Sequence, residues 1–190
     1  IINMVQQTAE EVFIPLTVGG GVRSVENIQS LLRAGADKVS INSAAIKDPN
    51  IIKSSSKYFG SQCIVVAVDV RRNNNNWIVY SHGGTKNTGI DAIEWLKNVQ
   101  MLGAGEILLT SMDKDGTKSG FDLEILSIAN KILKIPVIAS GGVGSIEHFY
   151  EGVNIGNADA LLAASVFHFN QFSIMDVKKY LKEQNIEVRI

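Results

Sequence analysis

The 190-residue chain contains one cysteine, almost no net charge and no long apolar run. Cys63 cannot form a disulfide within the chain, which fits a reducing compartment such as the cytoplasm. A net charge of −1 predicts no general attraction to nucleic acid or membrane surfaces. No stretch reaches the roughly 18 apolar residues of a membrane-spanning helix. The sequence also lacks a signal peptide, a dinucleotide fingerprint, a Walker loop and a metal-ligating cluster, so we expect no cofactor and no metal.

Apolar residues make up 45% of the chain, enough for the core of one domain over residues 1–190. Short apolar segments alternate with longer amphipathic ones, which indicates a parallel sheet with crossover helices. We predict strands at 16–18, 38–41, 63–70, 106–110, 137–140 and 160–163. We predict helices up to about 12, from 24, from 48, and at 91–102, 122–131 and 174–184. A small hairpin at 73–80 and a long polar loop at 83–89 complete the prediction, which contains six β/α units.

Two sequence motifs occur twice. Val18–Val22 resembles Ala139–Val143, and Ala36–Ser43 resembles Ala158–Ser165. The two pairs are offset by 121 and 122 positions. Gly-Gly and Ala-Asp pairs are common in unrelated sequences, but the shared order and spacing favour a duplicated half-barrel.

The repeat predicts more strands than this chain supplies. Each half of a duplicated barrel should hold four strands, and only two precede residue 63. We therefore expect two further β/α units upstream of Ile1, in a complete protein of about 250 residues. The predicted fold is an α/β (β/α)₈ TIM barrel with duplicated half-barrels, here lacking about the first two units. We expect the activity of this chain alone to be impaired.

Two glycine pairs, Gly20–Gly21 and Gly141–Gly142, each end a predicted strand and precede a helix. Glycine lets the backbone approach an anion closely, and helix N-termini favour negative charge. The second pair, with Ala164–Ser165, predicts the phosphate site that barrels commonly build after their last two strands. The first pair, with Asn42–Ser43, predicts a second site. Two opposed phosphate sites imply a substrate with a phosphate at each end, although turn glycines without a ligand remain the alternative.

Two carboxylates are candidates for acid–base chemistry. Asp69 ends a long apolar strand, where a charge is costly unless it serves the barrel mouth. Asp115 lies in the loop after the next strand, beside Gly116, and either carboxylate could act as a general acid or base. The alternatives are a turn cap for Asp69 and ordinary Asp-Gly turn chemistry for Asp115. Asp113 and Asp122 are better interpreted as loop and capping residues. The three histidines show no ligand spacing, and we interpret them as structural or surface residues: His82, His148 and His168.

Several segments together resemble the cyclase subunits of imidazole glycerol phosphate synthase. The similarity runs over essentially the whole chain, and the segments at 115–120 and 163–168 are specific to the resemblance rather than general barrel features. The segments that carry it are 18–22, 36–42, 83–89, 103–111, 115–120 and 163–168.

The resemblance implies a reaction of histidine biosynthesis. Such cyclases combine ammonia with a ribulosyl aminoimidazole carboxamide ribonucleotide that carries two phosphates. They close the imidazole ring and cleave the substrate into imidazole glycerol phosphate and aminoimidazole carboxamide ribonucleotide, without a redox cofactor or metal. Two aspartates serve as acid and base. One matches Asp69, and the other belongs to a first strand that is not in this chain.

The resemblance also implies binding positions. Asp115 matches a supporting carboxylate near one phosphate, and Asn87 and Thr110 match substrate contacts. One phosphate site matches Gly21, Asn42 and Ser43. The other matches Gly116, Gly142, Ala164 and Ser165.

In the resembling enzymes a glutaminase subunit docks on the amino end of the barrel and supplies ammonia through its core. Lys38 and Glu106 begin their predicted strands and match a charged gate at that end. Asp37 and Gln62 match partner-facing positions. Without the resemblance, Lys38 and Glu106 would be interpreted as a simple ion pair, and that alternative stays open.

Three other interpretations remain. The sister isomerase of the pathway shares the duplicated half-barrel and both phosphate sites but performs an Amadori rearrangement without ammonia. A related subunit passes ammonia to a nucleotide sugar in polysaccharide synthesis. A non-catalytic barrel could bind phosphates or activate a glutaminase. The segments at 114–120 and 85–89, together with Ser165, favour the cyclase over the two enzymes.

Overall fold

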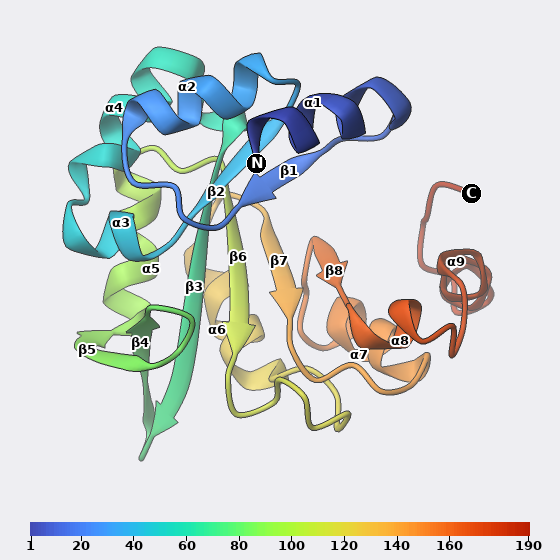
Figure 1. Ribbon diagram of the computed structural model, residues 1–190. Helices are drawn as coiled ribbons and strands as arrows, with labels where there is room; N and C mark the ends of the chain where they lie inside the picture. The colour runs from blue at the N-terminus through green and yellow to red at the C-terminus, as the bar shows by residue number, and fades with distance from the viewer.

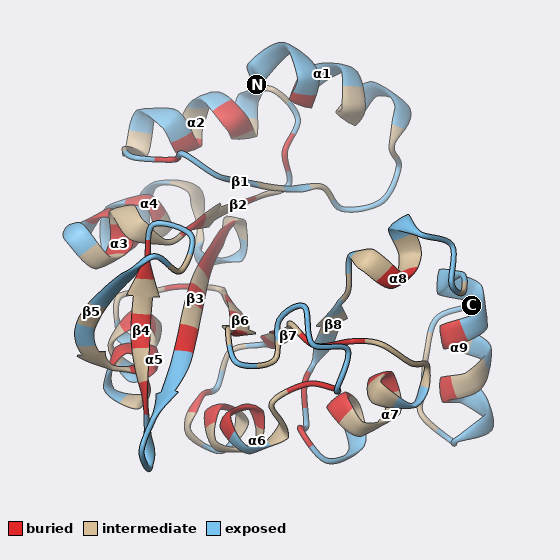
Figure 2. Ribbon diagram, turned by 60° about the horizontal axis from the view of Figure 1, so that its bottom comes forward, coloured by how far each residue is buried: buried red, intermediate tan, exposed pale blue.

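The computed structural model describes residues 1–190 and places six parallel strands in one curled sheet. Their order is β1-β2-β3-β6-β7-β8, so β1 and β8 are the two edges and do not pair with each other. In Figure 2 the strands form a curved row, and the helices lie on its outer side. The parallel strands are β1 (Thr17–Gly19), β2 (Lys38–Ile41), β3 (Ile64–Asn73), β6 (Glu106–Ser111), β7 (Val137–Ser140) and β8 (Ala160–Leu162). This is an open (β/α) barrel, as the alternation of apolar and amphipathic segments predicts.

Helices connect the strands and cover the outside of the sheet (Figure 1). The predicted starts at Ser24 and Asp122 are confirmed, since each side chain accepts a hydrogen bond from a backbone N–H of the first turn. No helix is both long and apolar enough to cross a membrane. The helices are α1 (Ile2–Glu11), α2 (Val25–Arg33), α3 (Ser43–Lys47), α4 (Asn50–Phe59), α5 (Ala92–Met101), α6 (Leu123–Ile132), α7 (Glu147–Asn154), α8 (Ser165–His168) and α9 (Ile174–Glu183), with the 3₁₀ turn η1 (Ser61–Cys63). Helices α3 and α8 were not predicted, and α7 was predicted only as a helix after Gly141–Gly142, without bounds.

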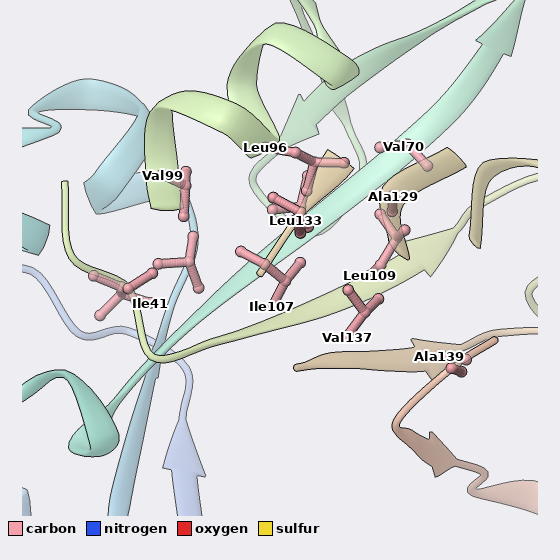
Figure 3. Packing of buried hydrophobic residues seen from close by; sticks show 14 of the residues in the cluster. Ile41, Val70, Leu96, Val99, Ile107, Leu109, Ala129, Leu133, Val137 and Ala139 are labelled. Carbon is pink, nitrogen blue, oxygen red and sulfur yellow. The ribbon is translucent and has the colours of Figure 1, made fainter. Parts of the chain in front are cut away.

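The hydrophobic core lies between the outer face of the sheet and the helices. Burial alternates along β2 and β6, with Val39, Ile41, Ile107 and Leu109 fully covered and their neighbours partly open. Figure 3 shows the last three of these packing with residues of α5 and α6. Because successive strand side chains point to opposite faces, the less buried set faces the concave side of the sheet. That set therefore supplies the candidate site.

The prediction of a loop at 83–89 is wrong in its second half. Residues Lys86–Asp91 form strand β5, which pairs antiparallel with β4 (Asn76–Ser81). Strand β4 in turn pairs antiparallel with the C-terminal half of β3, Asp69–Asn73. The predicted hairpin is thus a three-stranded extension of the sheet. Thr88 was not recognised as a strand residue because it lies among glycines and polar residues, yet its hydroxyl donates to the Val79 carbonyl at 2.7 Å and fixes the pairing. Helix α5 then begins with Asp91 as its cap.

The predicted repeat is visible in the hydrogen bonds of the two edge units. The Asp37 carboxylate accepts from the Leu16 N–H at 2.7 Å, and the Asp159 carboxylate accepts from the Val137 N–H at 2.8 Å. In return, each aspartate N–H donates to the carbonyl of the same strand residue, at 2.9 and 3.0 Å. The same registers follow in β1–β2 and β7–β8. Each aspartate therefore fixes where its two strands begin.

Candidate functional site

A cavity of about 1470 Å³ opens at the carboxyl ends of β1, β2 and β3, beside the β4–β5 extension. It brings together one part of the predicted site: Gly21, Asn42, Ser43, Asp69 and Asn87. Carboxyl ends of parallel strands carry the binding sites of such barrels, because the loops that follow them converge there. The predicted first phosphate site and the predicted catalytic carboxylate therefore share one cavity.

Asp69 lies on the concave face of β3, between Thr110 of β6 and Tyr80 of β4 in the strand register. Burial raises the pKa of its carboxyl group, and the negative charge of Asp115 raises it further. A hydrogen bond from Asn42 acts in the opposite direction by stabilising the charged form. A carboxyl group with a raised pKa at the mouth of a parallel sheet is suited to exchanging a proton with a ligand.

Asn42 follows β2 directly and reaches across to β3. Its Nδ2 donates to Oδ2 of Asp69 at 2.9 Å, while its Oδ1 is buried and has no hydrogen-bond partner. In the same turn, the Ser43 hydroxyl oxygen accepts from the backbone N–H of His82 at 2.9 Å. That bond leaves the Ser43 hydroxyl hydrogen free to donate to a ligand. The turn after β2 is thereby tied both to Asp69 and to the β4–β5 connection.

The β4–β5 connection forms the outer wall of the cavity. His82 has a left-handed backbone, with φ of 54°, and its ring nitrogen Nδ1 lies 2.9 Å from the Ser81 hydroxyl. Asn87 holds this wall together, since its Nδ2 donates to the Tyr80 hydroxyl at 3.3 Å and its Oδ1 accepts from the Gly89 N–H at 2.8 Å. The sequence indicated neither that His82 lines this cavity nor that Lys86 does. For this segment the sequence predicted only a long polar loop at 83–89.

The loop after β6 contains the other predicted carboxylate and glycine. Asp115 and Gly116 are exposed in this loop, and Thr110 lies beside Ser140 at the end of β7. A Cβ built on Gly141 would lie 3.3 Å from the Asp115 Cβ, so the loops after β6 and β7 touch. These residues lie outside the cavity lining, at the ends of β6 and β7. They are nevertheless on the same side of the sheet, its carboxyl end, as the cavity.

The predicted second phosphate site lies at the β7 and β8 ends. Gly142 is buried against the carbonyl of Gly120. Ala164 and Ser165 follow β8, which pairs in parallel with β7, so they lie beside the glycine turn. Next to them, His148 accepts hydrogen bonds at Nδ1 from the N–H groups of the turn before α7, at 3.1 and 3.2 Å. This bonding is a structural role for His148. No group of three or more His, Cys, Asp or Glu side chains converges in the way a metal site requires.

Lys38 and Glu106 form an ion pair at the opposite, amino end of the sheet. Each begins its strand, and they bridge the concave face across β3, which lies between β2 and β6. Their side chains are only 28% and 19% exposed, so the pair is partly withdrawn from water. The two side chains therefore pair at the predicted end of the sheet, which suits both the simple ion pair and the predicted gate.

Asp37 and Gln62 lie at the same amino end and are both exposed. Asp37 already has a structural role, because its carboxylate binds the backbone of Leu16. Gln62 lies in η1 and donates from Nε2 to the Phe59 carbonyl at 3.3 Å. Asp37 therefore has a reason to be present that does not involve a partner.

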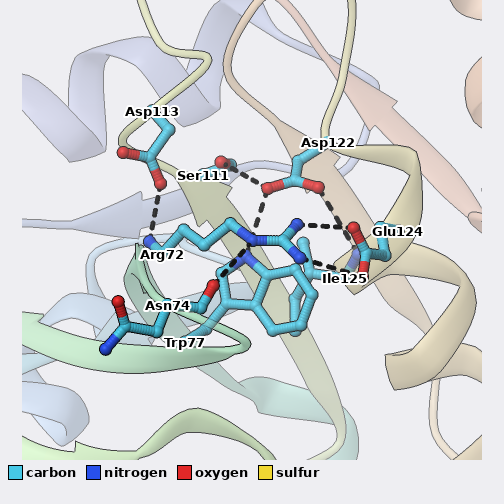
Figure 4. Close-up of polar contacts among 8 residues, drawn as sticks. All are labelled: Arg72, Asn74, Trp77, Ser111, Asp113, Asp122, Glu124 and Ile125. Atoms are coloured by element: carbon cyan, nitrogen blue, oxygen red, sulfur yellow. Dashed lines mark hydrogen bonds and ion pairs between the residues drawn. The ribbon is translucent and has the colours of Figure 1, made fainter.

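A polar cluster that the sequence did not reveal joins the hairpin to α6 (Figure 4). The Arg72 guanidinium pairs with Glu124 and lies over the Trp77 ring, 4.7 Å from its centroid. Asp122 accepts from the Trp77 indole N–H at 3.3 Å and from the Ser111 hydroxyl at 3.0 Å, in addition to capping α6. These five residues come from four separate elements, β3, β4, β6 and α6 with its cap, which is why no local pattern predicted the cluster. The cluster borders both ends of the loop that contains Asp115.

A comparison with models of protein families identifies the family of this chain. The model of the histidine biosynthesis protein family matches residues 1–173. The chain belongs to this family. The matched residues include the parallel sheet, the cavity lining and both glycine turns. The concave face described above therefore belongs to a barrel enzyme of histidine biosynthesis. The cyclase resemblance is narrower than this match, and it enters below as a proposal.

Proposed function

We propose that the protein is the cyclase of imidazole glycerol phosphate synthase. It would combine ammonia with the ribulosyl aminoimidazole carboxamide ribonucleotide, giving imidazole glycerol phosphate and aminoimidazole carboxamide ribonucleotide. The observation that carries the proposal is the position of Asp69. Its carboxyl group has a raised pKa, is hydrogen-bonded by Asn42 and lies in a cavity that also contains Gly21 and Ser43.

The arrangement gives each end of the substrate a place. One phosphate would lie at Gly21 and Ser43, whose free hydroxyl hydrogen can donate to it. The other would lie at the turns after β7 and β8, near Gly142 and Ser165. The reacting atoms between them would then face Asp69, with Thr110 beside it on β6 and Asp115 in the loop after that strand. Positioning of a long substrate by both ends is an effective way to align it with an acid–base group.

The ion pair at the amino end supports the ammonia-dependent step over the isomerase. Lys38 and Glu106 lie at the end of the concave face opposite to Asp69. We propose that this pair gates ammonia supplied by a glutaminase subunit, which would dock around Asp37 and Gln62. An isomerase that needs no ammonia has no use for a partly buried ion pair at this end other than stability.

The test is a product assay with ammonium salt as the nitrogen source. The assay should use the full-length protein. We expect both nucleotide products, and we expect Asp69→Asn to lower turnover by at least 10²-fold, the lower range for loss of an acid–base group. Glu94→Gln, an exposed change on α5, is the matched control and should retain wild-type turnover.

Other outcomes assign the protein differently. Turnover of the phosphoribosyl precursor without ammonia would identify the isomerase. A folded protein that turns over neither substrate, yet binds a bis-phosphorylated ligand, would be a non-catalytic barrel. Glutamine-dependent turnover on addition of a glutaminase subunit would test the partner separately from the chemistry.

A further inference from the structure

The side-chain amide of Asn42 makes a hydrogen bond through its nitrogen but none through its oxygen. Its Nδ2 donates to Asp69 Oδ2 at 2.9 Å, and its Oδ1 is buried without a partner although Asn42 lines the cavity. A buried carbonyl oxygen without a donor is unfavourable for folding. Asn42 itself belongs to the cavity lining, so its amide connects Asp69 to that lining.

The contact also makes the two oxygens of Asp69 unequal. Oδ2 is held by Asn42, whereas no group of the chain is hydrogen-bonded to Oδ1. The other titratable groups around this carboxyl are Tyr80, its neighbour on β4, Asp115 after β6, and His82 and Lys86 on the outer wall. No hydrogen bond joins any of these four to Asp69. Asn42 is thus the one residue that fixes how the carboxyl group is turned.

We propose that Asn42 is a positioning residue for Asp69, holding Oδ2 so that Oδ1 exchanges the proton. The inference rests on the proposed function and deepens it, because it assigns Asn42 to the acid–base group as well as to a phosphate site. The amide donates to Oδ2 through Nδ2, and it can keep this bond when the proton is on Oδ1, because Oδ2 is then still an acceptor. The bond is stronger to the charged carboxylate, which is why it opposes protonation.

Substitutions at Asn42 separate positioning from simple binding. Asn42→Ala removes the bond that favours the charged form, so the pKa of Asp69 should rise and the acid limb of the kcat/KM profile should move to higher pH. Asn42→Asp places a second carboxylate there and should move the limb further in the same direction. Both variants should lower kcat by at least 10-fold. Ser43→Ala is the matched control from the same turn, and it should raise KM and leave the limb unchanged.

A direct titration keeps this inference distinct from the proposed reaction. Carbon-13 NMR of the labelled Asp69 carboxyl group should show a higher pKa in Asn42→Ala than in the wild type, whether or not the protein turns over the cyclase substrate. If the wild type is inactive but this pKa moves, the proposed function fails and the contact between the two residues stands. An active enzyme in which neither the Asp69 pKa nor the acid limb moves in Asn42→Ala overturns the inference. Circular dichroism of each variant identifies any loss of fold.

Discussion

The backbone N–H of Gly120 donates to the carbonyl oxygen of Gly142 at 2.8 Å. This bond closes the loop after β6 onto the turn after β7, and it does so without space for a side chain. A Cβ built on Gly142 would lie 2.1 Å from the Gly120 carbonyl oxygen, and the φ of Gly142 is 102°. The two turns that flank Asp115 therefore depend on glycine for their contact.

Gly142→Ala should accordingly destabilise the protein more than the equivalent change in the other half-barrel. We expect a cost of roughly 2–4 kcal/mol, in the range of severe steric and backbone changes. Gly21→Ala is the matched control, because its φ is 71° but no atom lies within 4 Å of the added Cβ. It should cost only the backbone strain of about 1–2 kcal/mol. Equal costs in urea unfolding would show that the loop contact adds nothing.

The repeat shows how much of this geometry the sequence contained. The glycine pairs and the Ala-Asp pairs gave the strand ends and the offset between halves, because each has a local backbone function. Asp37 and Asp159 bind the start of their strands, and the glycines allow turns with positive φ. Such functions depend on neighbouring residues only, so a sequence pattern can predict them.

Contacts between distant segments could not be predicted in the same way. Thr88 holds its own strand β5 against β4, and His82 reaches the cavity through a left-handed backbone that is uncommon for residues other than glycine. The bond between Asn42 and Asp69 joins residues 27 positions apart. Both residues were predicted site residues, but the sequence assigned them to different roles and gave no sign that they touch.

Asp69 should reduce stability at neutral pH. Its pKa is raised above the ordinary value near 3.8, mainly by burial, so the folded state binds the proton more tightly than the unfolded state does. The stabilising contribution of the protonated group is complete below about pH 4 and is lost as the pH rises through the folded-state pKa. At pH 7 the charged, partly buried carboxylate therefore opposes folding.

Asp69→Asn should for this reason be more stable than the wild type at pH 7, by roughly 0.5–2 kcal/mol, the range of common stabilising substitutions. The difference should shrink as the pH is lowered toward 4, where the wild-type carboxyl group is protonated. Urea unfolding of both proteins at several pH values measures this. A variant that is less stable at pH 7, or a difference independent of pH, would contradict the argument from burial.

Asp122 should matter more than its place at a helix start suggests. Its carboxylate accepts from Ser111, from Trp77 and from the Ile125 N–H, so Asp122→Ala removes a cap and leaves two further donors unpaired (Figure 4). We expect a loss of about 2–3 kcal/mol, above the ~1 kcal/mol typical of a cap alone. Asp91→Ala, a cap of α5 that binds only backbone N–H groups, is the comparison. Similar losses in thermal unfolding would mean that the Ser111 and Trp77 bonds are not needed.

The ion pair between Lys38 and Glu106 can be tested as a pair, separately for stability and for its proposed gate role. Glu106→Leu leaves the partly buried ammonium group of Lys38 without its partner and should cost about 1–3 kcal/mol. Adding Lys38→Met should restore most of this loss, since an apolar pair of similar size replaces two charges that water reaches poorly. The urea-unfolding cycle of the two single variants and the double variant measures the coupling.

For the proposed gate, the double variant of Lys38 and Glu106 should keep turnover with ammonium salt but lose efficiency when a glutaminase supplies the ammonia. If both nitrogen sources are affected equally, the pair contributes only to the fold.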